Sequence, residues 1–154
     1  MKLIRKLAAT NAPAAVLLVR LVVGLVFLSE GVQKFLFPGD PDRGAARFAK
    51  LGFSAPEFTA AFVGAFEVVC GVLIVFGLLT RLAVIPTIAI MLVAIGMTKI
   101  PILANKGFWD MAHAARTDWA MLLGSVFLLL VGAGRWSLDA RLADGHAGGR
   151  RDAP

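Results

Sequence analysis

Four long stretches of mostly apolar residues, separated by polar or helix-breaking segments, run through this chain of 154 residues. They lie at residues 14–37, 54–79, 82–98 and 119–136 and are called spans one to four below. A helix needs about 20 such residues to cross the hydrocarbon core of a bilayer, where only helices and closed barrels satisfy every backbone polar group. We therefore predict an all-α fold, an integral membrane four-helix bundle.

Composition and charge exclude two other classes of protein. Hydrophobic residues make up 58% of the chain, whereas soluble domains usually contain about 45–50% apolar residues, so a soluble enzyme is excluded. The formal net charge is +6, but the basic residues lie at the ends of the spans and not on one soluble face, as phosphate binding would require. We therefore expect contacts with membrane lipids and no nucleic-acid partner.

The connection between spans one and two contains strong helix breakers. Two prolines and a glycine follow Phe37 and end span one. Residues 42–53 place basic side chains on one side and apolar side chains on the other, which predicts a short helix lying in the membrane interface. Span two begins with Ser54 as the expected N-cap and Pro56 in the first turn.

The later connections differ in length. Residues 80–81 leave only a tight turn between spans two and three, so these spans should be antiparallel neighbours, with Pro86 in the first turn of span three. Residues 99–118 are polar and are interrupted by Pro101 and Gly107. We expect them to form a loop before span four.

The chain divides into a basic N-terminus at residues 1–13, the four-helix transmembrane domain at 14–142 and a disordered tail at 143–154. The first span should remain uncleaved, because no small-x-small site follows its apolar run. With a cytoplasmic N-terminus, the cytoplasmic side would hold Lys2, Arg5, Lys6, Arg81, Arg135, Arg141, Arg150 and Arg151, and the outer side Arg43, Arg47, Lys50, Lys99, Lys106 and Arg116. The larger first set predicts that both termini are cytoplasmic.

Three ionisable residues stand out inside the apolar spans. Arg20 and Glu30 lie in span one, and Glu67 lies near the middle of span two. A charge at the centre of a membrane helix costs about 2.5–3.5 kcal/mol on insertion scales, so each one needs a partner or a function. Gly64 and Gly71 flank Glu67 at helical spacing, which would allow a neighbouring backbone to approach this face closely.

One face of span one is also polar and small. Arg20, Gly24, Gly31 and Lys34 follow one stripe, with Glu30 and Gln33 beside it. Such a face is unsuited to contact with lipid, so it should pack against span two. We expect Arg20 and Glu67 to neutralise each other there, and Glu30 to pair with Lys34.

These residues together predict a buried polar chamber that opens outward between the four helices. Its predicted members are Arg20, Glu30, Gln33, Lys34, Glu67, Lys99 and Asp118, and the predicted helix-packing residues are Gly24, Gly31, Gly64 and Gly71. The charges could simply fix which helices touch, because buried ion pairs often stabilise no more than apolar packing does. They could equally form a site for a ligand, a proton or a partner, since intramembrane ionisable residues usually mark function.

The remaining reactive side chains do not suggest catalysis or metal binding. Cys70 is the only cysteine, so an internal disulfide, a CxxC redox pair and a cysteine zinc site are excluded. His113 and His146 have no partner at ligand spacing. We expect no metal and no intrinsic cofactor.

Four segments in a fixed order resemble the DoxX family of small bacterial four-span membrane proteins. They are RLVVGLVFLSEGVQKF at residues 20–35, GFSAPE at 52–57, FEVVCGVLIVFGLLTR at 66–81 and GAGRWSLDARL at 132–142. The resemblance extends over about residues 16–142. It implies a multi-pass protein of the bacterial cytoplasmic (inner) membrane, with family features at Arg20, Gly24, Gly31, Lys34, Glu67, Gly71 and Arg81.

The resemblance also suggests a redox context. One relative is the membrane subunit of a thiosulfate-oxidising, quinone-reducing enzyme, and another assembles with superoxide-detoxifying and sulfur-transfer proteins. It therefore implies an accessory subunit that anchors a redox partner and offers the chamber to a quinone head group. Two alternatives stay open: a transport or binding module in which Glu67 and Glu30 carry a proton or hold a solute, and a quinone-linked oxidoreductase. Whether the chain is itself an enzyme or forms a homo-oligomer stays open too.

Overall fold

Four helices that are long and apolar enough to cross a membrane dominate the computed structural model, which describes residues 12–144. They are α2 (Val16–Leu36), α4 (Pro56–Phe76), α5 (Thr80–Lys106) and α6 (Phe108–Val131). Two short helices complete the described part of the chain, α3 (Ala45–Lys50) and α7 (Leu138–Asp144). The all-α prediction and the prediction of four spans are confirmed. The predicted terminal segments 1–13 and 143–154 lie almost wholly outside the described residues.

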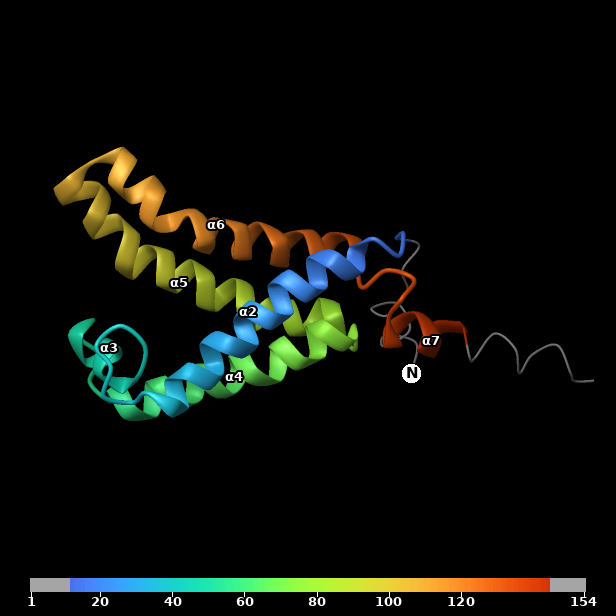
Figure 1. Ribbon diagram of the computed structural model, residues 1–154, viewed down its shortest axis with the longest axis horizontal. Helices are drawn as coiled ribbons and strands as arrows, with labels where there is room; N and C mark the ends of the chain where they lie inside the picture. The colour runs from blue at the N-terminus through green and yellow to red at the C-terminus, as the bar shows by residue number, and fades with distance from the viewer. Residues whose placement is uncertain (1–11, 145–154) are drawn as a thin grey trace, which may run out of the picture.

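The long helices form two antiparallel pairs, α2 with α4 and α5 with α6 (Figure 1). The pairs meet at the end of the bundle that carries α7 and the turn between α4 and α5, which we call the α7 end. They spread apart toward the other end, the α3 end, which carries α3 and the turn between α5 and α6 (Figure 1). Contacts within each pair are accordingly much more extensive than contacts between the pairs.

Glycines bring the backbones of α2 and α4 into direct contact. A Cβ atom added to Gly24 would lie 2.8 Å from the carbonyl oxygen of Gly71, and one added to Gly31 would lie 2.7 Å from that of Gly64. No real side chain tolerates such contacts, so only glycine permits this crossing. The two glycine pairs fix the register: Gly24 lies opposite Gly71, and Gly31 lies opposite Gly64.

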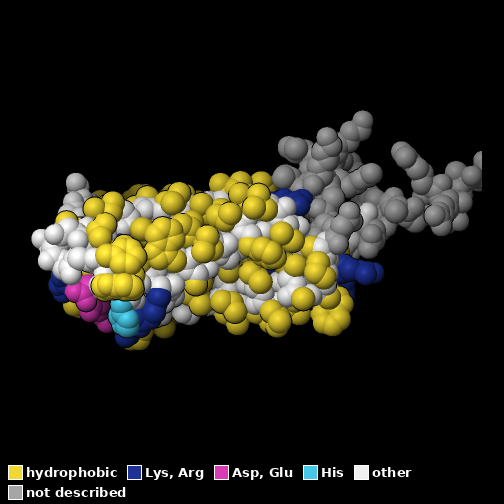
Figure 2. All heavy atoms as spheres, turned by 90° about the horizontal axis from the view of Figure 1, so that it is seen from above, with side chains coloured by type: hydrophobic (Ala, Val, Ile, Leu, Met, Phe, Trp, Pro, Cys, Tyr) yellow, Lys and Arg dark blue, Asp and Glu magenta, His cyan; other side chains and the backbone are white. Residues whose placement is uncertain are grey.

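The outer surface of the bundle is suited to lipid. Hydrophobic side chains cover the middle of the face seen in Figure 2, and charged side chains gather at the two ends. Large apolar residues that elsewhere would be buried are exposed along the helices, among them Leu18, Phe62, Leu92 and Leu130. Lipid chains can cover such a surface as well as protein can.

The predicted loop over residues 99–118 is wrong, because this segment is helical. α5 continues to Lys106 and α6 begins at Phe108, with only Gly107, at φ +89°, between them. The polarity of the segment suggested a loop, but polar residues do not break a helix, whereas the positive φ of Gly107 does. Pro101 lies inside α5, where its loss of one hydrogen bond is tolerated.

Two local predictions at helix starts are also wrong. Pro86 does not lie in a first turn, because α5 begins at Thr80 and Pro86 falls in its interior. Ser54 does not cap span two: the N-cap residue of α4 is Ala55, no side chain caps it, and Pro56 is the first helical residue. The short helix expected within residues 42–53 is confirmed as α3.

Candidate functional site

A cavity of about 540 Å³ lies between the two helix pairs at the α3 end of the bundle. All four long helices and α3 contribute to its wall. Most lining residues are apolar, but six are charged: Glu30, Lys34, Arg47, Glu67, Lys99 and Asp118. Its volume and its mixture of apolar walls with a few polar groups are typical of small-molecule sites.

The first ion pair in the wall joins α2 to α4. Lys34 Nζ lies 2.6 Å from Glu67 Oε2, and the two side chains are only 7% and 6% exposed. Lys34 also donates a hydrogen bond of 3.3 Å to the backbone carbonyl oxygen of Glu30. A charge that would be costly inside the spans is therefore neutralised within one helix pair.

The second ion pair joins α5 to α6. Lys99 Nζ lies 3.1 Å from Asp118 Oδ2, with side-chain exposures of 14% and 17%. Both residues line the same cavity as Lys34 and Glu67. Each helix pair thus holds one internal ion pair, and the two ion pairs lie in opposite walls of the cavity.

The predicted ion pair between Arg20 and Glu67 is wrong. The glycine register places Glu67 opposite Leu28, about eight residues or 12 Å along the axis from Arg20. Side chains lean toward the N-terminus of their own helix, so Arg20 leans away from Glu67, whereas Lys34 and Glu67 lean toward each other. Lys34 therefore takes the place predicted for Arg20 as the partner of Glu67.

Arg20 lies instead at the α7 end, where it is 1% exposed. Its Nη2 donates a hydrogen bond of 2.7 Å to the carbonyl oxygen of Trp136, and its electrostatic partner is Asp139. Arg20 therefore does not line the cavity and connects α2 to the segment that precedes α7.

Asp139, which no pattern in the sequence marks as a site residue, connects α7 to the turn between α4 and α5. Its carboxylate accepts hydrogen bonds of 2.7 Å from Leu79 N and 3.0 Å from Thr80 N, and its own N–H donates one of 2.8 Å to the carbonyl oxygen of Gly77. It thus caps the N-terminus of α5 from a distant part of the chain, while Arg20 balances its charge. No local signal in the sequence points to this role, because the backbone groups that Asp139 caps lie 60 and 59 residues away in the chain.

Arg81 caps another helix end. Its Nε donates a hydrogen bond of 3.1 Å to the carbonyl oxygen of Leu129, near the C-terminus of α6. Backbone carbonyls at a helix C-terminus favour a cation. Arg81 and Arg20 therefore hold the α7 end together, away from the cavity.

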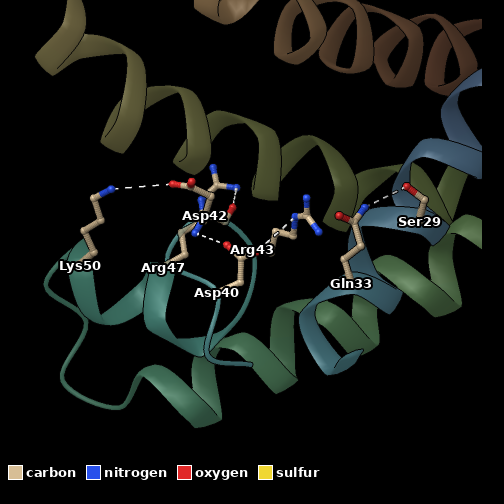
Figure 3. Close-up of polar contacts among 7 residues, drawn as sticks. All are labelled: Ser29, Gln33, Asp40, Asp42, Arg43, Arg47 and Lys50. Carbon is tan, nitrogen blue, oxygen red and sulfur yellow. Dashed lines mark hydrogen bonds and ion pairs between the residues drawn. The ribbon is translucent and has the colours of Figure 1, made fainter. Parts of the chain in front are cut away.

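Two further members of the predicted chamber differ from expectation. The side chain of Glu30 does not pair with Lys34, which bonds only its backbone. Gln33 is not part of the cavity wall; its Nε2 lies 3.4 Å from Ser29 Oγ (Figure 3). The structure thus brings together Glu30, Lys34, Glu67, Lys99 and Asp118, and leaves out Arg20 and Gln33.

Arg47 of α3 is a cavity residue that sequence reasoning missed. Its neighbours Phe48 and Leu51 line the cavity with it, so one face of α3 covers this end of the cavity. The sequence places the basic residues of the connection together on one side of a short interfacial helix, and nothing local distinguishes Arg47 from Arg43 or Lys50. Within residues 12–144, no group of three His, Cys, Asp or Glu side chains is placed to hold a metal ion.

These features define a small multi-pass helical membrane protein with a charged cavity between its helices. The chain belongs to the DoxX family, whose profile, described as DoxX, matches residues 15–100. That segment contains α2, α3, α4 and most of α5, and therefore five of the six charged cavity residues, all except Asp118.

Two relatives match most of the chain. The "Uncharacterized membrane protein Rv3486" of Mycobacterium tuberculosis is 49% identical over 144 residues, which cover 90% of this chain and 87% of the relative. The "Putative oxidoreductase CatD" of Bacillus subtilis is 30% identical over 140 residues, covering 89% and 93%. No solved structure gives a significant match.

Proposed function

We propose that this protein is an accessory membrane subunit of a redox system and that the cavity at the α3 end binds the polar head group of a small ligand. The observation that supports the proposal most directly is the buried Lys34–Glu67 ion pair in the cavity wall. Apolar packing would serve the α2–α4 contact equally well. A buried ion pair kept between two spans beside a cavity is better explained by a ligand.

The redox context is supported by the name of one relative, the oxidoreductase of Bacillus subtilis, and by the family resemblance. A quinone is the first candidate ligand, because its carbonyl oxygens could accept hydrogen bonds from the ammonium groups of Lys34 and Lys99. Its apolar part would meet walls such as Phe27 and Met97. The redox reaction itself would belong to the partner and the quinone.

We also propose that the protein lies in the bacterial cytoplasmic membrane with both termini in the cytoplasm. The distribution of Lys and Arg between the two ends supports this orientation. The cavity would then open toward the outer face, on which α3 lies.

The partner can be tested by affinity purification from membranes solubilised in a mild detergent. A flavin-, haem- or iron–sulfur-containing protein should be recovered with the tagged chain at least tenfold above an unrelated tagged four-span protein. Failure to recover any redox protein, with and without chemical cross-linking before solubilisation, would refute the accessory role.

The ligand can be tested on the same preparations by extraction and mass spectrometry. Quinone should be present in stoichiometric amount in the wild type and lost in Glu67→Gln. Glu57→Gln is a matched control, because Glu57 lies on the same helix but is exposed and outside the cavity. Equal quinone in both variants would exclude Glu67 from ligand binding.

A binding or transport module is a second candidate, favoured by the carboxylates of Glu30 and Glu67 in one cavity. The four long helices are continuous, whereas many carriers bind solutes at interrupted helices. Solute or proton flux in reconstituted vesicles that is abolished by Glu67→Gln would favour this function. An absorption spectrum with a bound chromophore would instead favour a self-contained oxidoreductase.

A further inference from the structure

The charges of the cavity are not all neutralised by one another. Lys34 pairs with Glu67, and Lys99 pairs with Asp118. Of the six charged lining residues, this leaves Glu30 and Arg47, for which no ion pair occurs among the described residues. One is an anion on α2 and the other a cation on α3, so the cavity presents two opposite unpaired charges.

The carboxylate of Glu30 is directed to the cavity by its position on α2. Val26, Phe27 and Lys34 of the same helix also line the cavity, and Glu30 falls on the helical face that they share. Glu30 is exposed and is one of the residues that line the cavity. A carboxylate within a membrane span favours a partner, and residues 12–144 supply no cation in an ion pair with Glu30.

The guanidinium group of Arg47 is only partly used by the protein. Its Nη1 donates one hydrogen bond of 3.2 Å to the carbonyl oxygen of Asp42 (Figure 3). The nearby Arg43 and Lys50 pair with Asp40 and Asp42, respectively. Arg47 is half-buried, and a guanidinium group has five N–H donors, so most of its donors remain for a ligand.

The two unpaired charges act on the same part of the cavity. Both Glu30 and Arg47 are electrostatic neighbours of the Glu67 carboxylate, although they come from different elements. Phe48 and Met97 add apolar surface to the wall beside them. A ligand with one charge would satisfy one of the two groups and face repulsion from the other.

From this charge pattern we propose that the cavity binds a small zwitterion with an apolar body, whose anionic group contacts Arg47, whose cationic group contacts Glu30, and whose body packs on Phe48 and Met97. The inference rests on the proposed use of the cavity as a ligand site, but it does not depend on a redox partner. Both an apolar α-amino acid and the head group of a zwitterionic lipid have this chemistry. The closed ion pairs of Lys34 and Lys99 would remain intact on binding.

Binding can be measured on the full chain in nanodiscs, with empty nanodiscs as the reference for membrane partitioning. The probes are 2-aminooctanoic acid and dihexanoyl-phosphatidylethanolamine as the two zwitterions, and octanoate and octylamine as the single charges. At least one zwitterion should bind about tenfold more tightly than either single charge. Tighter binding of 2-aminooctanoic acid would indicate a free amino acid as the ligand. Tighter binding of dihexanoyl-phosphatidylethanolamine would indicate a lipid head group.

Two substitutions test the assigned contacts. Arg47→Gln and Glu30→Gln should each weaken zwitterion binding about tenfold. Arg43→Gln and Glu57→Gln, which remove exposed charges outside the cavity, should change it less than twofold. The preference should also switch: Glu30→Gln should favour octanoate and Arg47→Gln should favour octylamine, which an unfolded variant could not show.

The inference is overturned if the single charges bind as tightly as both zwitterions, or if neither cavity substitution changes binding. Decylubiquinone separates this failure from failure of the proposed function. If decylubiquinone binds saturably and equally to the wild type, Arg47→Gln and Glu30→Gln while neither zwitterion binds, the zwitterion site is wrong and the quinone site stands. Zwitterion binding without decylubiquinone binding would support the zwitterion site and refute the quinone site.

Discussion

Removing Lys34 should destabilise this protein strongly, because it would leave the Glu67 carboxylate without its cation in the interior of the spans. The two side chains are only 7% and 6% exposed, so solvent screens their interaction little. Breaking such a buried pair by removing one partner costs about 3–5 kcal/mol. We expect Lys34→Met to lower the free energy of unfolding by that amount. Lys34→Met together with Glu67→Leu should recover most of the loss, since apolar packing can replace a buried ion pair.

The protein and its variants are unfolded in mixed micelles by titration with SDS. The resulting free energies of unfolding are combined in a double-mutant cycle. A matched control is the Arg43–Asp40 pair, whose side chains are 49% and 31% exposed. Its coupling energy should lie between 0 and about 1 kcal/mol. A coupling energy for Lys34 and Glu67 no larger than that of the control would refute the reasoning, because the pair would then behave as a surface pair.

Three further predictions concern other parts of the molecule. Gly31→Val should separate α2 from α4 and lower the free energy of unfolding by at least about 2 kcal/mol, whereas Gly96→Val, at a site with no neighbour within 4 Å, should cost less than about 1 kcal/mol; equal losses in SDS titration would contradict the close crossing. Asp139→Asn should weaken the cap on α5 and leave Arg20 unbalanced, which costs about 1–3 kcal/mol; an unchanged melting temperature would argue against the cap. Glu30→Cys should react with a water-soluble maleimide, while the native Cys70, which is 4% exposed, should not. Reaction of Cys70 alone would contradict the position of the cavity beside Glu30.

The spans were predictable because the bilayer acts on each helix separately. Apolar length alone decides whether a segment can cross, and no contact between segments is needed for that inference. Errors arose only where a helix boundary depends on single residues. Gly107 ends α5 where Pro101 does not, because a positive φ breaks the helix whereas a proline removes one hydrogen bond.

Much of the cavity could also be read from the sequence. The sequence marks Glu67 as a costly charge and predicts Lys34, Lys99 and Asp118 as further members of one polar chamber, and the structure places all four around one cavity. The predicted ion pairs of Arg20 with Glu67 and of Glu30 with Lys34 were wrong. The glycine spacing contained the register that would have excluded Arg20, since Gly24 opposite Gly71 and Gly31 opposite Gly64 place Arg20 too far from Glu67.

The roles of Arg47 and Asp139 depend on contacts between distant parts of the chain. Arg47 resembles its exposed neighbours in sequence, and it becomes a cavity residue only because α3 folds over the space between the helix pairs. Asp139 caps α5 from 59 residues away. No local pattern encodes either contact.

The amino-acid sequence by itself determined that this is a four-span helical membrane protein with charges that need partners, because hydropathy and helical periodicity act within one segment. The tertiary structure decided where each charge lies: it paired Lys34 with Glu67, placed Arg20 against the carbonyl oxygen of Trp136 and within the electrostatic influence of Asp139, and left Glu30 and Arg47 lining a shared cavity. The physical reason is that an ion pair forms between side chains within about 4 Å of each other. That proximity depends on the register and direction of packed helices, which only the whole fold specifies.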